Sequence, residues 1–367
     1  MSLSSFLAQF DPAQEIEYSW TPPSSWYIEK DFLRAEIEHL FNNHWLYLGS
    51  AQELKQPGDF VTYQVVNQPV VVTRGQDDRI RAFYNVCRHH AACVASGKGN
   101  TEVLTCPYHG WAYRLDGSLR KAPRLGKLEN FNAKEFGLVE IALEIWGGLM
   151  FCHFGAPTQS VAQLYPGLGD FLQPADLESL NFEVRREYTL ECNWKVFVDN
   201  YLDGGYHVEY LHPDLAAGLD LDNYETLIRT NFSIQQCKSA ENDARLGRGA
   251  VYAFLYPNVM FNRYGDILDI NLVLPQGPDR CLVIFDYFFA PHCSREFIEK
   301  SLQSSHQVQL EDVGICESVQ RGLKSRGYDK GRYAPRIELG ELHFAKMLYS
   351  TLAEGSGFIH PNQLSHQ

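Results

Sequence analysis

Four potential metal ligands between residues 87 and 109 constrain this chain more than any other feature. Cys87 and His89 form a Cys-x-His pair, and after sixteen intervening residues Cys106 and His109 form a Cys-x-x-His pair. The short spacing within each pair lets both side chains point inward from one loop. The segment between the pairs contains Gly, Ser and Ala, which suit the turns that bring two loops together. We therefore expect a centre held by two thiolates and two imidazoles.

Two kinds of metal centre use such a ligand set. Two cysteines on one iron and two histidines on the other hold a Rieske 2Fe-2S cluster. A structural zinc site also takes two cysteines and two histidines, and it is the alternative. The iron–sulfur cluster is favoured because each pair combines one cysteine with one histidine, and because Gly110 and Trp111 follow the second pair.

The segment that ends in Cys106-Pro-Tyr-His-Gly-Trp resembles the Rieske domain of Rieske-type oxygenases. Respiratory Rieske proteins, as a family, carry a disulfide between the two loops. Here Cys93 could supply one half of it, but Tyr108 stands where the second cysteine would be needed. The resemblance therefore implies a lower-potential cluster of the oxygenase type, which receives electrons from a soluble donor.

Length and charge narrow the class of protein. A chain of 367 residues favours two domains. The formal net charge of −13 argues against nucleic-acid binding, because such a surface releases no counterions from a phosphate backbone. Nine cysteines, an odd number, indicate a reducing compartment. The N-terminal residues lack a signal-peptide pattern and no apolar run reaches membrane-spanning length, so we expect a cytoplasmic protein with no membrane partner.

The apolar pattern predicts a small antiparallel β domain around the two loops. A helix is expected over residues 31–46, where apolar residues recur at helical spacing. Runs rich in Val, Thr and Tyr predict strands, and Asp116-Gly117 is a turn signal. The strands are expected at residues 59–66, 68–74, 80–86 and 145–154. This domain spans residues 45–155, and a catalytic domain comprises residues 1–44 and 156–367.

A second set of possible ligands lies at the start of the catalytic domain. Two histidines and one carboxylate on one face of an iron leave positions open for dioxygen and substrate, as in non-heme Fe(II) oxygenases. His207 and His212 are five residues apart, which is about 140° around an ideal α-helix. Both can face one ion only if the helix ends or is distorted between them, and Gly204, Gly205 and Pro213 favour this.

The segment from Asn193 to His212 resembles the iron-binding motif of Rieske oxygenase α subunits. The resemblance implies that His207 and His212 are iron ligands. It also implies a third ligand, an Asp in a Glu-Asp-x-x-x-x-Glu-x-x-Gln pattern on a helix near the C-terminus. That pattern begins here at Glu311, so Asp312 is the predicted third ligand.

The family usually places a bridging carboxylate, which couples the two metal centres across a subunit boundary, three residues before the first histidine. Gly204 occupies that position here. The nearest acids are Asp203, four residues before His207, and Asp199, eight residues before it. Asp203 is the first candidate for the bridge and Asp199 the second. Asn200, next to Asp199, completes the set of candidate catalytic residues.

Several longer segments resemble the choline monooxygenase-like branch of this family, over about residues 20 to 350: DNYLDGGYHVEYLH, YAFLYPN, FDYFFA and LEDVGICESVQRGLKSRGYDKGRYA. The resemblance implies an α+β protein, in which a Rieske domain accompanies an antiparallel sheet around a long C-terminal helix, a helix-grip arrangement. It also implies a homotrimer. The sequence contains no flavin or plant-type ferredoxin motif after residue 320, so a separate reductase or ferredoxin is expected, and NAD(P)H would act only indirectly.

We therefore predict a monooxygenase that hydroxylates or N-demethylates a small substrate with O2, a quaternary ammonium compound such as choline or a betaine. Such a cation needs aromatic faces. The candidate aromatic residues are Tyr201, Tyr206, Tyr210, Phe254, Phe261, Tyr264, Tyr287 and Phe289. A betaine carboxylate would need Arg263 or Arg245. The alternatives are an oxygenase of neutral aromatic compounds and a non-catalytic electron carrier with two irons per chain.

Overall fold

The structure is a computed structural model that describes residues 2–126, 128–238 and 249–360. The chain forms two compact units, Asn43–Val161 and Met1–Asn42 with Ala162–Gln367. Both units combine helical segments with antiparallel sheets, which confirms the predicted α+β class. Among the described helices, none has the combination of length and hydrophobicity that a membrane crossing needs.

The smaller unit contains two antiparallel sheets. The first has the strand order β1-β10-β9-β4-β3-β2-β5, and the second has the order β6-β7-β8. The strands of the first sheet are β1 (Leu46–Ser50), β2 (Asp59–Val65), β3 (Gln68–Arg74), β4 (Ile80–Tyr84), β5 (Lys98–Asn100), β9 (Glu140–Trp146) and β10 (Leu149–His153). Those of the second are β6 (Val103–Thr105), β7 (Ala112–Arg114) and β8 (Leu119–Lys121). Two 3₁₀ turns complete the unit, Ala51–Glu53 and Ala133–Phe136.

The single strand predicted at residues 145–154 is wrong, because the chain reverses within it. β9 and β10 pair with Trp146 opposite Leu149, so Gly147 and Gly148 form a two-residue hairpin loop. Both glycines have positive φ, 58° and 75°, as a type I′ turn requires. Apolar residues continue on both sides of the loop, and the pattern of hydrophobicity therefore gave no sign of the break.

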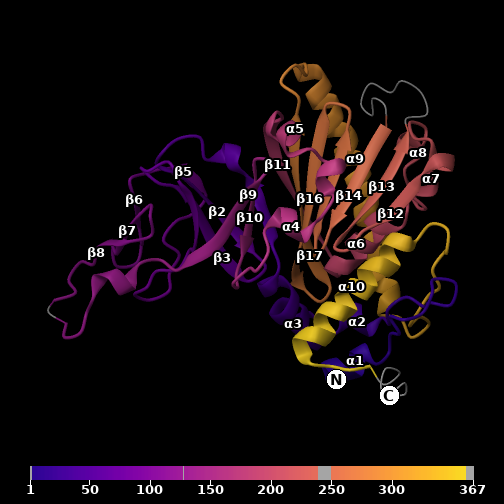
Figure 1. Ribbon diagram of the computed structural model, residues 1–367, viewed down its shortest axis with the longest axis horizontal. Helices are drawn as coiled ribbons and strands as arrows, with labels where there is room; N and C mark the ends of the chain where they lie inside the picture. Colours follow the sequence, from indigo (N-terminus) through magenta and orange to yellow (C-terminus); the bar gives the residue numbers. More distant parts are fainter. Residues whose placement is uncertain (1, 127, 239–248, 361–367) are drawn as a thin grey trace. The chain divides into compact units, whose positions relative to one another are not determined.

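The larger unit is built on a seven-stranded antiparallel sheet (Figure 1), with the order β11-β17-β16-β15-β14-β13-β12. Strands β12 to β17 follow one another as a meander, and β11 pairs with the last of them. The strands are β11 (Asn181–Leu190), β12 (Glu225–Ile228), β13 (Phe232–Lys238), β14 (Gly249–Leu255), β15 (Val259–Tyr264), β16 (Ile267–Gly277) and β17 (Arg280–Phe289). The long helix α9 (Arg295–Leu323) runs along this sheet, and α6 (Trp194–Leu202) contacts both α9 and strands β16 and β17.

A group of helices closes one end of this unit, where α10 packs against α1 and the segment after α3 (Figure 1). The helices are α1 (Leu3–Leu7), α2 (Ser25–Ile28), α3 (Lys30–Ala35) and α10 (Leu339–Ser356). The helix predicted over residues 31–46 ends earlier, through a π-helical turn (Glu36–Leu40) and a 3₁₀ turn (Phe41–Asn43). Short helices elsewhere are α4 (Val161–Leu164), α5 (Pro174–Glu178), α7 (Val208–Leu211) and α8 (Pro213–Ala216), with 3₁₀ turns at Leu168–Asp170 and Leu221–Asn223.

The π-helical turn positions a buried ion pair that fixes α6. The Lys195 ammonium lies 2.7 Å from Oε1 of Glu36, and both side chains are almost fully buried. The indole of Trp194 donates to the other carboxylate oxygen of Glu36 at 3.1 Å. A buried charge pair of this kind is costly to break, because removing one partner leaves the other uncompensated. The start of α6 is therefore held firmly, shortly before the segment that carries the two histidines.

Candidate metal centres

The first loop of the smaller unit follows β4 and is closed by the side chain of Asn85. Its amide oxygen accepts hydrogen bonds from the backbone N–H groups of Val94 and Ala95, at 2.9 and 3.0 Å, and its amide nitrogen donates to the Ala95 carbonyl. Within the loop, the Cys87 N–H donates to the Ala92 carbonyl at 2.8 Å. The role of Asn85 in closing this loop was not predicted from the sequence. Its position two residues before the first cysteine is the only local signal for it.

The second loop is the tip of the β6–β7 hairpin. The Cys106 N–H donates to the Trp111 carbonyl at 2.8 Å, and the Gly110 N–H donates back to the Cys106 carbonyl at 3.1 Å. Gly110 has a φ of 73°, in the left-handed region that favours glycine. This turn lets Cys106 and His109 extend from the same side of the loop tip.

The two loops bring the four predicted ligands of the first centre together. The rings of His89 and His109 lie 4.7 Å apart between centroids, and His89 stacks on Trp111 at 4.9 Å. Burial raises the pKa of the Cys87 thiol, but hydrogen bonds from Tyr113 and other neighbours outweigh it, so the pKa of Cys87 is lowered. A lowered pKa favours the thiolate, which is the form that binds metal.

The chemistry of this site fits a metal cluster. Nδ1 of His89 is buried, and it has no hydrogen-bond partner within the described residues. Buried polar atoms in proteins are nearly always satisfied, so an unpaired ring nitrogen between two cysteines and a second histidine is best explained as a ligand atom. Cys93, in the first loop, is a free and exposed cysteine.

The second centre lies in the larger unit, at a break between helices. α6 ends at Leu202, and Gly204 and Gly205 then adopt φ values of 70° and 77°. A Cβ at Gly204 would lie 2.4 Å from the Ile337 carbonyl oxygen, so this turn requires glycine. His207 precedes α7, and His212 separates α7 from α8. Because the helix ends between them, the two rings lie 5.1 Å apart between centroids instead of on different faces of one helix.

Asp312 of α9 is the third member of this centre. Its Oδ1 lies 3.0 Å from Nε2 of His212 and 3.9 Å from Nε2 of His207. One atom from each of the three residues lies within 4.8 Å of the others, which is a separation that one metal ion can span. Asn200 of α6 donates a hydrogen bond to the same Asp312 oxygen at 2.9 Å. Asn200 therefore orients the carboxylate.

Each histidine of this centre is oriented by a carboxylate. Nδ1 of His207 lies 2.6 Å from Oδ2 of Asp203, and Nδ1 of His212 lies 2.6 Å from Oε2 of Glu311. Burial lowers the pKa of His212, but its hydrogen bonds with Asp312 and Glu311 outweigh burial, so the pKa is raised. Carboxylates that hold one ring nitrogen in this way leave the other nitrogen for a metal. Glu311 was present in the matched pattern, but no role had been predicted for it.

The two remaining acids near the turn have different surroundings. Asp203 accepts backbone hydrogen bonds from Gly205, Tyr206 and His207, so it also stabilises the glycine turn. Asp199 instead accepts a hydrogen bond from the Tyr27 hydroxyl at 2.8 Å, and burial raises the pKa of Asp199 to about 7. It lines a second cavity, together with Asp203, Glu338 and Glu341. The two bridge candidates therefore differ in their contacts: Asp203 contacts His207, whereas Asp199 contacts Tyr27.

A cavity of about 130 Å³ opens onto the three candidate ligands. One row of side chains crosses the sheet from β13 to β17, with each residue paired to the next on the adjacent strand. The row consists of Gln235, Tyr252, Asn262, Asp269 and Tyr287. The first four of these line the cavity. The other lining residues, apart from the ligands, are Phe197, Asn200, Tyr201, Gly205, Val208, Leu215, Leu219, Tyr224, Tyr264, Asn271, Phe285, Ser305, Val308 and Gln309.

Of the eight aromatic residues predicted to surround the substrate, the structure places Tyr201 and Tyr264 at this cavity. Tyr206 and Tyr210 lie on the surface, with 50% and 81% of their area exposed. The prediction missed Tyr224, Tyr252, Phe197 and Phe285. Polar residues at alternate positions of otherwise apolar strands, such as Asn262 with Tyr264, were the signal that could have identified the cavity wall.

The other four predicted aromatic residues are buried inside the unit and are not among the residues that line the cavity. The Phe254 ring packs edge-on against Phe344, and the Phe289 ring against Phe297. Tyr287 forms a 2.8 Å hydrogen bond with the Ser305 hydroxyl, in which either group can be the donor. The fourth, Phe261, is fully buried and alternates with Asn262.

The two arginines considered for a substrate carboxylate do not support that role. Arg263 lies between Asn262 and Tyr264 on β15, so its side chain leaves the opposite face of the strand. Its guanidinium donates to the Gly265 and Ile267 carbonyls. Arg245 lies outside the described residues.

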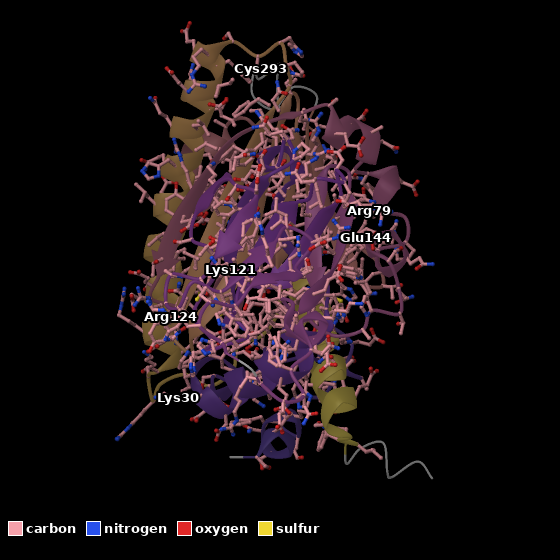
Figure 2. The ribbon with its side chains drawn as sticks, turned by 90° about the vertical axis from the view of Figure 1, so that its left-hand side faces the viewer. Lys30, Arg79, Lys121, Arg124, Glu144 and Cys293 are labelled. Atoms are coloured by element: carbon pink, nitrogen blue, oxygen red, sulfur yellow. The ribbon has the colours of Figure 1, made fainter. Side chains whose placement is uncertain are left out.

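A third group of possible ligands lies on the surface. Asp266, His292 and Cys293 are close together, and Figure 2 shows Cys293 at the end of the unit where β17 leads into α9. His292 and Asp266 form a 3.0 Å pair with 73% and 51% of their side chains exposed. This is the geometry of an ordinary surface ion pair.

A centre of two cysteines and two histidines, together with a second centre of two histidines and one carboxylate, is the ligand combination of a Rieske-type non-heme iron oxygenase. Comparison with known families agrees. A model described as "Rieske [2Fe-2S] domain" matches residues 44–132, and a model described as "Ring hydroxylating alpha subunit (catalytic domain)" matches residues 177–242 and 235–354.

Curated relatives extend over nearly the whole chain. The chloroplastic choline monooxygenase of Arabidopsis thaliana is 44% identical over 95% of this chain and 87% of its own length. The carnitine monooxygenase oxygenase subunit of Escherichia coli K12 is 31% identical over 84% of this chain and 86% of its own. A crystal structure of a quaternary ammonium Rieske monooxygenase with L-carnitine has a TM-score of 0.83 and 28% identity, covering 96% of this chain and 99% of that one.

The chain therefore belongs to the family of Rieske-type oxygenase α subunits, close to its choline monooxygenase-like branch. It is an oxidoreductase whose cofactors are a Rieske 2Fe-2S cluster and a mononuclear non-heme iron, and it uses O2 and electrons from an external reductase. The predicted cofactors and enzyme class are confirmed. The individual ligands stay predictions, which the geometry of both sites supports.

Proposed function

We propose that this protein is the oxygenase component that hydroxylates or N-demethylates a small quaternary ammonium compound. In this proposal, Cys87, His89, Cys106 and His109 hold the cluster, and the mononuclear iron is held by His207, His212 and Asp312. The observation that carries the proposal is the cavity rich in tyrosine that opens onto the second ligand set. The names of the relatives, which act on choline and carnitine, support the same substrate class.

The aromatic wall suits such a cation. A quaternary ammonium has no hydrogen-bond donor, and it is attracted to the faces of aromatic rings. Tyr201 and Tyr252 lie 6.5 Å apart between ring centroids at an interplanar angle of 84°, so they form two sides of a corner. Burial raises the pKa of Tyr201 and of Tyr224 well above the ordinary value, so both phenols stay protonated at neutral pH. They therefore offer neutral aromatic faces.

The residues around the iron ligands have separate tasks. Asp203 and Glu311 hold the Nδ1 atoms of the two histidines, and Asn200 holds one oxygen of Asp312. When bound, the iron supplies the activation of O2 and the cluster supplies the electrons. Leu215, Leu219 and Val308 line the same cavity and limit the access of water. A dry site protects a reactive centre from side reactions.

Electron delivery requires partners beyond this chain. We expect a homotrimer in which the cluster of one subunit serves the mononuclear iron of its neighbour, with Asp203 as the bridge. The 2.6 Å contact between Asp203 and His207 supports this assignment. Inter-subunit electron transfer is also named for a related structure, a quaternary ammonium Rieske monooxygenase. A separate reductase or ferredoxin is the expected donor. The cytoplasmic location stays a prediction, since the plant relatives are chloroplastic.

A substrate panel tests the proposed function. The iron-loaded protein is combined with a surrogate reductase, and O2 uptake, formaldehyde release and products are followed for choline, glycine betaine, carnitine and a neutral aromatic compound. We expect substrate-dependent O2 uptake with at least one quaternary ammonium compound and none with Asp312→Ala. Turnover of only the aromatic compound would show that the substrate class is wrong. Two irons per chain without turnover would instead indicate an electron carrier.

A further inference from the structure

One residue of the cavity has polar atoms that the protein itself leaves unsatisfied. Gln309 of α9 is 1% exposed and lines the cavity. Neither its amide nitrogen nor its amide oxygen has a hydrogen-bond partner within the described residues. A buried amide without partners is rare in proteins, because it loses its hydrogen bonds to water on folding and gains none in return. We therefore expect a polar group of a bound ligand to form hydrogen bonds with this amide.

The helix places this amide next to the iron centre. The buried positions of α9 include Ser305, Gln309, Asp312 and Cys316, which recur at intervals of three or four residues and so share one face of the helix. Gln309 precedes Asp312 by three residues, about 4.5 Å along the helix axis. Ser305, one turn further back, is already paired with Tyr287 at 2.8 Å. On this face of α9, Gln309 therefore lies between the iron ligand Asp312 and Ser305, whose hydroxyl already has a hydrogen-bond partner.

The chemistry of an amide indicates what it binds. Gln309 offers one donor group and one acceptor group side by side. An alcohol satisfies both, because its O–H donates to Oε1 and its oxygen accepts from Nε2. A carboxylate has no donor, so it would leave Oε1 unpaired and place negative charge against it. A quaternary ammonium group satisfies neither atom. The amide therefore matches a hydroxyl group on the substrate.

The charges of the cavity favour the same ligand. Asp269 lines it and is not an iron ligand, and no lysine or arginine is found among the described residues that line it. Both oxygens of Asp269 accept hydrogen bonds, from Asn262 and from Tyr264. Acidic groups attract a cation and repel a substrate carboxylate. A cationic alcohol fits this wall better than a zwitterion such as a betaine.

We propose that Gln309 binds the hydroxyl group of a quaternary ammonium alcohol and thereby selects choline-like substrates over betaines. This inference rests on the proposed function, since it assumes a quaternary ammonium substrate. The tyrosine corner holds the trimethylammonium group, and Gln309 holds the other end of the molecule. Because Gln309 lies one helical turn from Asp312, the carbon that bears the hydroxyl is kept close to the iron. Gln309 is a specificity-determining residue in this account.

The test compares Gln309→Leu with the wild-type holoenzyme. Dissociation constants for choline, ethyltrimethylammonium and glycine betaine are measured by calorimetry, and KM and kcat are measured for each compound that turns over. We expect Gln309→Leu to weaken choline binding about ten- to a hundredfold, which is the effect of losing one or two buried hydrogen bonds. Binding of ethyltrimethylammonium, which has no hydroxyl, should stay within about twofold of wild type. The wild-type enzyme should prefer choline to glycine betaine.

Two further variants keep the result interpretable. Val308→Ala changes a neighbouring lining residue without touching the amide, so it should affect choline and ethyltrimethylammonium equally. Gln309→Asn retains an amide on a shorter side chain, and it should recover part of the preference for choline if Gln309→Leu folds poorly. An equal loss for both ligands in Gln309→Leu, or a wild-type preference for glycine betaine, would overturn the inference while leaving the proposed function intact. Absence of binding by any quaternary ammonium compound to wild type would overturn both.

Discussion

The two metal centres of this protein are built in different ways. The ligands of the cluster come from two loops within 23 residues of sequence, and hydrogen bonds of the loop backbone and of the neighbouring Asn85 side chain set their positions. The ligands of the mononuclear iron come from a break between two short helices and from α9, about a hundred residues later. Its histidines are set by side chains, Asp203 and Glu311, instead of by the backbone. One centre is local, and the other depends on the packing of the whole larger unit.

This difference predicts how each centre responds to mutation. Loops held by hydrogen bonds within their own short segments need few distant supports, so the cluster should be lost mainly when a ligand is removed. At the mononuclear site, the side chains of Asp203, Glu311 and Asn200 hydrogen-bond to the ligands and tune their geometry and basicity. A change in one of these side chains can therefore lower activity while the ligands themselves are kept. Mutations at the two sites therefore separate loss of metal binding from loss of activity with the metal still bound.

The largest effect is expected at the local centre. Cys106→Ser or His109→Ala should abolish the visible absorption of the cluster and all turnover, because each removes one of four ligands. Absorption spectra and iron content measure this, and the mononuclear iron should be retained at about one per chain. Cys93→Ser is the control, since Cys93 is an exposed, free cysteine in the first loop. Normal cluster absorption in either ligand variant would show that the assignment is wrong.

The next largest effect is expected from Asp312→Ala. Removal of this ligand should lower iron from three per chain toward two and abolish turnover, with the cluster spectrum unchanged. The matched control is Glu317→Ala on the same helix, whose carboxylate accepts a hydrogen bond from the Glu191 backbone. If Asp312→Ala kept three irons and activity, another carboxylate would have to be the ligand.

The third prediction distinguishes orientation of a histidine from electron delivery. Asp203→Asn and Glu311→Gln each weaken a 2.6 Å contact to a histidine Nδ1. We expect both to lower iron affinity or activity to a similar degree, about 10- to 100-fold. Asp203→Asn should in addition slow oxidation of the reduced cluster by orders of magnitude. Equal cluster oxidation rates in the two variants, after full iron loading, would mean that Asp203 only orients His207 and caps the glycine turn.

The smallest effect concerns stability. Burial raises the pKa of Asp199 to about 7, above that of an unfolded aspartate near 3.9. The folded state therefore binds the proton more tightly, and its stability falls as the pH rises from about 4 through 7. An asparagine side chain cannot ionise and can still accept the Tyr27 hydrogen bond, so Asp199→Asn should raise Tm at pH 8 and change it little at pH 4. The difference corresponds to at most about 4 kcal/mol. A larger gain in Tm at pH 4 than at pH 8 would contradict this.

The sequence predicted the local centre well because its information is local. The spacing of Cys87, His89, Cys106 and His109 implied two short loops, and the structure has them. For the larger unit, the helix break between His207 and His212 followed from helix geometry, and Pro213 begins α8 where the break was expected. The position of Asp312 relied on family resemblance, because no local pattern links it to the histidines across about a hundred residues.

The substrate cavity was the least predictable region. Which face of a strand a residue occupies depends on register, and a shift of one residue moves every side chain to the opposite face. Tyr252 and Tyr264 reach the cavity, whereas Phe261 does not, although all three lie on neighbouring strands. The amide of Gln309 was also missed, since its lack of a partner becomes visible only when the surrounding side chains are placed.

The central claim is that the two centres work as one enzyme, with electrons of the cluster used at the mononuclear iron. It is tested most directly by following single-turnover oxidation of the reduced cluster on addition of O2 and substrate, in wild type and in Asp312→Ala. The account predicts rapid oxidation with product formation in wild type, and a cluster that stays reduced, without product, in Asp312→Ala. Cluster oxidation and product formation at the wild-type rate in Asp312→Ala would contradict it.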